Sequence, residues 1–265
     1  MTAGQGNLHA LVVGGTRGIG RTLVRQLSAA GNVVSVLGRS RTTNLGDLPR
    51  VRAWPVDVAD SSELDRALAG VEKENGPASG VVLLQRYRGE GDEWAGEVAT
   101  TLVATRQLLD WASQHLQDQG EGKSVVVISS IAGVYIASEQ PVSYHMAKAA
   151  LTHMVRYYAV KLGPRQIRVN AISPGTIVKE ESKAFYRDHP DLEQLYREIV
   201  PLGRMGTADD VAHLAQFLLS ARASFLTGQN IVLDGGASLH SHESLARSVS
   251  PLRDLNVTRS GSKPS

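Results

Sequence analysis

Short runs of β-branched and apolar residues alternate along this chain with longer helical patterns, and that alternation limits what it can fold into. A strand, a helix and a second strand form a βαβ unit, and repeated units build a parallel sheet covered by helices. Several apolar runs are continuous, as expected of strands that are buried on both faces. The sequence therefore predicts an α/β fold with a parallel sheet in one domain.

The alternation gives approximate boundaries for each element. Strands are predicted at 8–13, 33–37, 51–55, 81–84, 124–128, 167–172 and 230–233. Helices are predicted at 18–30, 61–71, 94–116, 144–162 and 208–220. The charged, helix-capable segment 179–200 interrupts the alternation and is predicted to form a lid. We expect the domain to span 1–238, and 239–265 to be a flexible C-terminal tail because polar residues, glycine and proline dominate there.

The composition excludes several classes of protein. Of the 265 residues 42% are hydrophobic, and the formal net charge is only +2, so neither nucleic acid nor an anionic membrane is indicated as a partner. No apolar run is long enough to span a bilayer, and the first residues lack the pattern of a signal peptide. The absence of cysteine excludes disulfides and thiolate metal sites, and the histidines form no convincing metal-ligand pattern. A cytoplasmic protein without a metal fits this composition.

A glycine-rich loop lies between the first predicted strand and the first predicted helix. Gly14, Gly18 and Gly20 allow a tight turn, a close approach of backbone to a pyrophosphate, and close packing of helix on strand. The helix that follows offers free N–H groups and the positive end of its dipole to a phosphate. A purely structural turn is the alternative interpretation. We predict a dinucleotide site that includes Gly14, Thr16, Arg17, Gly18, Ile19 and Gly20.

The residues after the second and third strands bear on which dinucleotide binds. An NAD site usually places a carboxylate after the second strand, but this chain has Arg39, which can pair with a 2′-phosphate together with Arg17. Solvated arginines without a ligand are the alternative. We predict a preference for NADP(H). Asp57, after the third strand, can accept a hydrogen bond from the adenine amino group, or it can serve only as a turn or capping residue.

Tyr144 and Lys148 are four residues apart, so both side chains lie on one face of a predicted helix. A free tyrosine has a pKa of about 10 and is a poor proton donor at neutral pH. A nearby ammonium group stabilises the phenolate and lowers that pKa. Ser130, at the carboxyl end of the preceding strand, can hydrogen-bond a substrate oxygen. These residue types suit carbonyl reduction, in which Tyr144 protonates the oxygen as hydride arrives from a nicotinamide.

A second pair, Tyr157 and Lys161, has the same spacing, and Ser143 precedes it by fourteen residues. Ser143 does not end a strand, however, and Tyr157 falls well inside the helix. We interpret Tyr157 and Tyr158 as part of a core or interface face.

Together these motifs resemble the classical short-chain dehydrogenase/reductase family over residues 8–237. The resemblance rests on the loop 14–20, Asp57-Val58, Ser130, Tyr144 with Lys148, the run Arg168-Val-Asn-Ala-Ile-Ser-Pro-Gly175 and the closing Asp234-Gly-Gly236. It implies a Rossmann-like, doubly wound sheet of about seven strands, a nicotinamide cofactor, and a homodimer or homotetramer.

The resemblance also implies roles for individual residues. Tyr144 is expected to be the general acid/base, Lys148 to bind the nicotinamide ribose and lower the phenol pKa, and Ser130 to polarise the substrate carbonyl. The expected cofactor contacts outside the glycine loop are Arg39, Asp57, Val58, Tyr144, Lys148, Pro174, Gly175 and Ile177.

The chain departs from the family pattern around this site. Leu84-Gln85-Arg86-Tyr87 replaces the usual Asn-Asn-Ala-Gly, and no asparagine occurs between Asn75 and Asn170. The asparagine expected in the next helix is replaced by Thr101, or by Glu97 in another register. We expect an altered proton relay in which Thr101 holds a water and Arg86 or Tyr87 faces cofactor or substrate.

Three functions remain open from the sequence. The first is NADP(H)-dependent transfer of hydride between nicotinamide and a small carbonyl or alcohol substrate, as in a ketoreductase of specialised or acyl-chain metabolism. The second is enoyl reduction, dehydration or isomerisation on the same scaffold. The third is a non-catalytic NADP(H)-binding protein. The charged residues of segment 179–200 are either its solvated face or an indication of a polar substrate.

Overall fold

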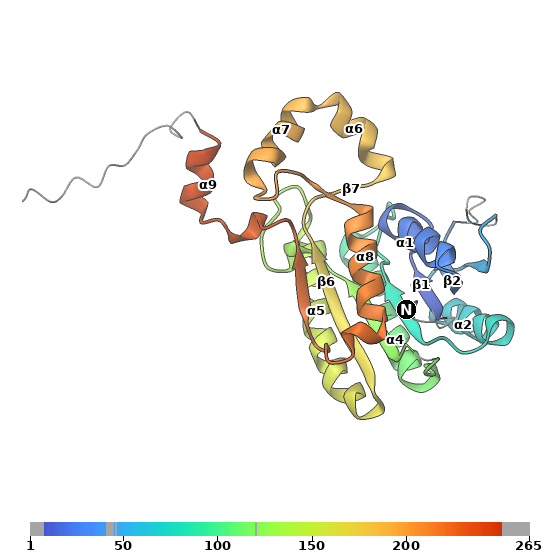
Figure 1. Cartoon of the computed structure of the whole chain (residues 1–265). Helices are drawn as coiled ribbons and strands as arrows, with labels where there is room; N and C mark the ends of the chain where they lie inside the picture. The colour runs from blue at the N-terminus through green and yellow to red at the C-terminus, as the bar shows by residue number, and fades with distance from the viewer. Residues whose placement is uncertain (1–7, 41–44, 46, 120, 251–265) are drawn as a thin grey trace, which may run out of the picture.

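The protein, described here by a computed structural model for residues 8–40, 45, 47–119 and 121–250, is built on a parallel sheet of seven strands (Figure 1). The strand order is β3-β2-β1-β4-β5-β6-β9. The strands are β1 (His9–Val13), β2 (Val33–Gly38), β3 (Val51–Pro55), β4 (Gly80–Leu83), β5 (Lys123–Ile128), β6 (Ile167–Pro174) and β9 (Asn230–Leu233). The predicted Rossmann-like α/β fold is confirmed, and each predicted strand lies within two residues of an observed one.

Alternate residues of each strand enter two separate cores, one on each face of the sheet. Ala10 and Val12 of β1 pack in the core with α1 (Gly18–Ala29) and α8 (Ala208–Leu219). Leu11 and Val13 pack in the other, with α2 (Ser61–Asn75), α4 (Ala104–His115) and α5 (Val142–Leu162). This division explains the continuous apolar strand runs, because every position on such a strand faces a helical layer.

Local signals set the ends of several helices. Asp60 caps α2 by accepting a hydrogen bond from the N–H of Glu63, and Gly76, at φ 75°, follows its last residue. Thr207 caps α8, because its hydroxyl oxygen accepts a hydrogen bond from the N–H of Asp210. Short 3₁₀ turns with both ends in the described residues are η3 (Ile131–Gly133), η4 (Gly163–Arg165), η5 (Glu180–Ser182), η6 (Ala221–Ala223) and η7 (Ala237–Leu239).

The predicted helix 94–116 differs from expectation because it is not α-helical throughout. It consists of α3 (Glu93–Glu97), a π-helical segment η2 (Val98–Val103) and α4. A π turn widens the backbone and changes which side chains face the core, and such turns are frequent at functional sites. The β-branched run that includes Thr100 and Thr101 lowers the α-helical preference there.

The segment predicted as a lid forms two short helices, α6 (Lys183–Asp188) and α7 (Pro190–Ile199). The short parallel pair β7 (Ile177–Val178) and β8 (Gly206–Thr207) joins its two ends. Figure 1 shows α6 and α7 beyond the end of the sheet that β6 points toward. The prediction that this segment acts as a lid remains untested.

The first part of the predicted tail contains one more helix, α9 (His242–Ser248), whereas 251–265 lie outside the described residues. Its predicted flexibility therefore remains a prediction. Within the described part of the chain, no helix combines the length and the hydropathy that crossing a membrane requires.

Replacing Gly20 by alanine should destabilise the fold by about 2 kcal/mol or more, because the added Cβ would overlap the Gly14 carbonyl oxygen. Urea unfolding measures the change. Gly163→Ala is the matched control, since nothing lies near its added Cβ and its backbone is α-helical. Equal stability of the two variants would contradict the close packing inferred for the glycine loop.

Candidate active site

The predicted site residues converge at the carboxyl ends of the central strands. After β1 the chain proceeds to β2 and β3 on one side, whereas β4, β5, β6 and β9 extend the other side. Loops therefore diverge between β1 and β4, which is where open α/β sheets bind their ligands. The glycine loop follows β1, Arg86 follows β4, and Ser130 follows β5.

The glycine loop is folded tightly between neighbouring strands. Gly14 has φ +83° and donates its N–H to the carbonyl oxygen of Leu37 at 2.8 Å. A Cβ on Gly14 would lie 3.0 Å from the carbonyl carbon of Leu84. Glycine at this position therefore lets the loop pass directly against the backbone that follows β4.

A carboxylate from the segment 179–200 lies at the N-terminus of α1. Oε1 of Glu181 accepts hydrogen bonds from the Gly18 N–H and from Nη2 of Arg21, both at 3.1 Å. Hydrogen bonds from these donors help to hold the pKa of Glu181 below its ordinary value although burial opposes them. The site that was predicted to bind a pyrophosphate thus already holds an anionic oxygen of the protein itself.

Tyr144 and Lys148 occupy the first turns of α5, with the Lys148 ammonium 5.6 Å from the centroid of the Tyr144 ring. Lys148 is only 4% exposed, and its Nζ donates to the carbonyl oxygen of Ile128 at 3.1 Å. The Ser129 hydroxyl donates to the Lys148 carbonyl oxygen at 2.9 Å, which ties α5 to the end of β5. The helix, the strand end and the lysine therefore form one rigid unit.

Burial lowers the pKa of Lys148 to about 8. The negative charge of Glu97 opposes this shift, whereas the positive charges of Arg86 and Lys179 add to it. An ammonium group with such a pKa can lose its proton near neutral pH, so it can take part in proton transfer as well as stabilise a phenolate.

Ser130 begins the turn η3 after β5 and is half-buried. Its Oγ accepts a hydrogen bond from the Ala132 N–H at 3.1 Å. Because Oγ is the acceptor in this bond, its own hydrogen remains available to a substrate oxygen. A Cβ on Gly133 would touch the Lys148 backbone at 3.0 Å, so this turn packs directly on α5.

The residues that replace the family's Asn-Asn-Ala-Gly behave differently from one another. The Arg86 guanidinium carbon lies 4.3 Å from the centroid of the Tyr144 ring, and its Nη2 donates to Oε1 of Gln140 at 2.8 Å. The Tyr87 hydroxyl instead accepts the Gly91 N–H, and the Tyr87 ring packs on Gly96. Of the two expected candidates, Arg86 faces Tyr144 and Tyr87 mainly organises its own loop.

The remaining predicted cofactor residues lie in the glycine loop, or in and after strands β2, β3, β6 and β7. Arg17 and Arg39 are exposed, and Arg39 directly follows β2. Oδ1 of Asp57 accepts the Ala59 N–H at 3.0 Å, so the turn role is present whether or not adenine also binds there. Val58 is buried in the core, Pro174 ends β6, Gly175 donates its N–H to the Leu233 carbonyl oxygen, and Ile177 lies in β7.

The alternative pair Tyr157 and Lys161 lies on the outer surface. Tyr157 is 61% exposed, and Lys161 contacts Asp110 at 3.4 Å. The adjacent Tyr158 is buried and donates its hydroxyl to Oδ1 of Asp110 at 2.7 Å. Tyr158 therefore belongs to the core, as predicted, whereas an interface role for the exposed Tyr157 stays a prediction.

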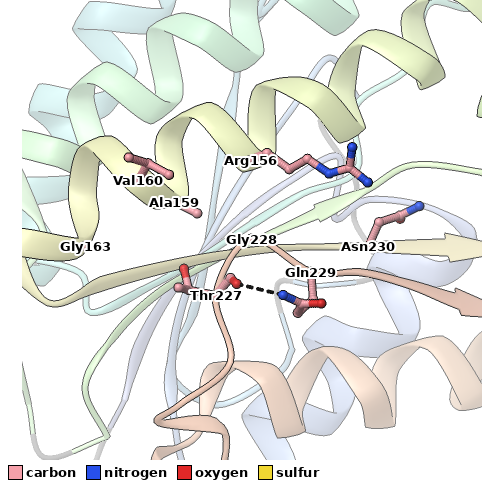
Figure 2. A pocket seen from close by; sticks show the side chains of 8 residues that line it. All are labelled: Arg156, Ala159, Val160, Gly163, Thr227, Gly228, Gln229 and Asn230. Carbon is pink, nitrogen blue, oxygen red and sulfur yellow. Dashed lines mark hydrogen bonds between the residues drawn. The ribbon is translucent and has the colours of Figure 1, made fainter.

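A cavity of about 680 Å³ lies at the other end of α5 (Figure 2). Its lining comes from the C-terminal half of α5 and from the turn before β9: Arg156, Ala159, Val160, Gly163, Thr227, Gly228, Gln229 and Asn230. Arg156 is its only charged residue, and Gln229 hydrogen-bonds the Thr227 carbonyl oxygen inside it. It has no acid/base group suited to catalysis. Across the described ranges, histidines and carboxylates form no cluster able to hold a metal ion.

Comparison with known proteins agrees with this geometry. A family model described as enoyl-(acyl carrier protein) reductase matches residues 13–238. L-xylulose reductase of Bos taurus is 32% identical over 238 residues, which cover 86% of this chain and 95% of that protein. Isoepoxydon dehydrogenase patN of Penicillium expansum is 29% identical, covering 89% and 96%.

Solved structures show the same architecture. A short-chain type dehydrogenase/reductase from Mycobacterium ulcerans superposes with a TM-score of 0.79 at 31% identity, covering 94% of this chain and 98% of that one. With the parallel sheet, the glycine loop and the Tyr144–Lys148 pair in place, the matches show that this chain belongs to the short-chain dehydrogenase/reductase family of oxidoreductases.

Proposed function

We propose that this protein is an NADP(H)-dependent reductase that transfers hydride between the nicotinamide and a small carbonyl or alcohol substrate. A ketoreductase of specialised or acyl-chain metabolism fits this proposal best. The observation that carries it is the buried Lys148 ammonium beside the Tyr144 ring, at the strand ends that also hold the glycine loop.

The residues present fit a dinucleotide. The Gly18 N–H and Arg21 bind a carboxylate oxygen of Glu181, and the same donors would bind a phosphate oxygen. In this account the cofactor phosphate replaces Glu181, and segment 179–200 shifts to admit it. The bound nicotinamide supplies the hydride.

The chain's own residues handle the proton and the substrate oxygen. Ser130 donates its free hydroxyl hydrogen to the carbonyl oxygen and orients it. Tyr144 gives its phenolic proton to that oxygen, and the nearby positive charges of Lys148 and Arg86 stabilise the phenolate that remains. Lys148 also donates a hydrogen bond to the Ile128 carbonyl oxygen. This bond fixes the position of the helix that carries Tyr144 relative to Ser130, two residues after Ile128.

The preference for NADP(H) is proposed from charge. Arg39 follows β2 and Arg17 lies in the glycine loop, both exposed and neither in an ion pair with a carboxylate among the described residues. A 2′-phosphate at this position would gain charge-assisted hydrogen bonds from guanidinium groups.

Enoyl reduction is the second candidate, because the description of the matching family model names that activity. Following NADPH absorbance with ketones, alcohols and enoyl compounds separates the two. Consumption with ketones supports the first proposal, and consumption with enoyl compounds alone supports the second. A non-catalytic NADP(H)-binding protein would show cofactor affinity and no turnover with any of them.

We also propose self-association through α5. Large apolar side chains line its outer face at helical spacing, namely Val142, Met146, Tyr157 and Val160, the last 81% exposed. An apolar stripe of this size on a helix is typical of an interface. A homodimer or homotetramer would bury it.

Tyr144→Phe should lower kcat by about 10²-fold or more, because the proton donor is lost, while NADPH binding is retained. NADPH absorbance gives kcat, and fluorescence titration gives Kd. Tyr157→Phe removes the exposed hydroxyl of the alternative pair and should keep the parent kcat. Near-normal rates in Tyr144→Phe would refute the assignment.

Arg39→Asp should weaken NADPH binding by about 10-fold or more while NADH binding is kept or improved, because only NADPH carries the 2′-phosphate. The ratio of the two Kd values is the measurement. Arg25→Asp makes the same change of charge at an exposed position of α1 and should leave the ratio unchanged. An unchanged ratio in Arg39→Asp, or equal efficiency of the parent with both cofactors, would count against NADP(H) preference.

Lys148→Met should stabilise the cofactor-free protein most at pH 8 and below, where the buried ammonium is charged. Burial depresses the folded-state pKa from 10.5 to about 8, so between these values the unfolded chain binds more protons and wild-type stability rises with pH. The advantage of the variant should therefore shrink as pH rises toward 10.5. Urea unfolding across this range tests it, and a difference independent of pH would contradict the depressed pKa.

A further inference from the structure

Glu97 is a buried side chain in which one of the two carboxylate oxygens has no hydrogen-bond partner among the described residues. It is 4% exposed, and its Oε2 accepts the Tyr87 N–H at 2.9 Å. Its Oε1 is buried and has no hydrogen-bond partner among the described residues. A charged oxygen buried in this way is costly unless water or another group binds it.

A second polar atom nearby is in the same condition. Thr101 lies one turn after Glu97, in the π-helical segment η2, and is fully buried with its Oγ1 unpartnered among the described residues. Thr101 and Glu97 are the two residues that the sequence offers in place of the expected helix asparagine. Two buried, unsatisfied oxygens on one short segment indicate internal water.

A small cavity joins Glu97 to the proposed proton donor. Its volume is about 30 Å³, and its lining residues are Arg86, Tyr87, Glu93, Glu97, Pro141, Ser143 and Tyr144. A volume of this size holds about one water molecule, and the polar lining supplies enough hydrogen-bond partners. One water can therefore contact both Glu97 and Tyr144 there.

We propose that Glu97 supplies protons to Tyr144 through a water in this cavity. The proposal rests on the proposed function, since it concerns the same proton donor. Glu97 acts through water and does not touch the substrate, so it is a positioning residue.

Hydride adds to the carbonyl carbon, the O–H bond of Tyr144 breaks, and that proton forms the O–H bond of the alcohol. The Glu97 carboxylate then accepts a proton from solvent and passes it through the water to the phenolate. Glu97 returns to its carboxylate form, so each turnover consumes one solvent proton.

Charged groups reach this site from several elements. Glu97 of α3, Arg86 after β4 and Lys179 after β7 all act electrostatically on Lys148 of α5. Tyr144 lies across the cavity, and Glu93, on α3, is exposed and lines the same space.

Glu97→Gln keeps the shape of the side chain but cannot carry the proton. We expect kcat to fall about 10-fold or more with KM and the Kd for NADPH unchanged, and the solvent deuterium isotope effect on kcat to increase. The pH profile of kcat should change as well, because one titrating group has been removed. Glu97→Asp should recover part of kcat, and formic acid should partly rescue Glu97→Ala.

Glu90→Gln is the matched control, because Glu90 is an exposed carboxylate of the same loop and does not line the cavity. It should behave as wild type. A Glu97→Gln enzyme with wild-type kcat, pH profile and isotope effect would overturn the proposal. So would slow Glu97 variants that neither aspartate nor formic acid rescues, because these indicate a purely structural role.

Two further measurements keep the test decisive. If Glu97→Gln fails to fold by circular dichroism, Glu97→Asp is used instead, and an unshifted pH profile in that variant overturns the proposal. Tyr144→Phe is assayed in parallel. If it stays active, the proposed function itself fails, whereas an inactive Tyr144→Phe beside a wild-type-like Glu97→Gln refutes only the relay.

Discussion

The burial of the Lys148 ammonium is the constraint on which the rest of the site depends. An isolated charge in this position would be strongly unfavourable, and the fold offsets that cost with the Ile128 carbonyl oxygen and the negative charge of Glu97. Ile128 ends β5 and Glu97 ends α3. Lys148 therefore has both partners only when these two ends pack against the first turns of α5. Because Tyr144 shares its helix face, the phenol is positioned by the same contacts.

The charged neighbours of Lys148 affect its pKa. Burial lowers the pKa of Lys148 to about 8, the positive charges of Arg86 and Lys179 act in the same direction, and the negative charge of Glu97 opposes them. Arg86 also lies over the ring of Tyr144. A site that lacks asparagines has thus acquired charged groups, which can move protons as well as bind water. The proposed relay and the proposed catalytic pair both depend on this electrostatic arrangement.

The fold could be predicted from the sequence because its signals are local and repeated. Continuous apolar strands, glycine turns and helix caps each specify the same parallel sheet, and β3 and β9 have the predicted bounds. The Tyr144–Lys148 pair was predictable because its helical spacing reports a shared face.

Other features depend on tertiary contacts that spacing does not encode. The π turn in η2, the insertion of Glu181 at α1 and the burial of Glu97 belong to this group. Glu97 could be named from the sequence only as one possible replacement for an asparagine, because burial is decided by the packing of α3 against α5. The charged segment 179–200 similarly looks solvated in the sequence, although Glu181 turns inward.

Direct tracing of the hydride is the measurement closest to the central claim. NADPH that carries deuterium at the hydride position is incubated with the enzyme and a ketone, and the alcohol product is analysed by mass spectrometry. The account predicts one deuterium on the carbon that bore the carbonyl oxygen, and none when Tyr144→Phe replaces the enzyme. Deuterium found only on a former double-bond carbon of an enoyl substrate, or no transfer to any ketone despite NADPH binding, would contradict it.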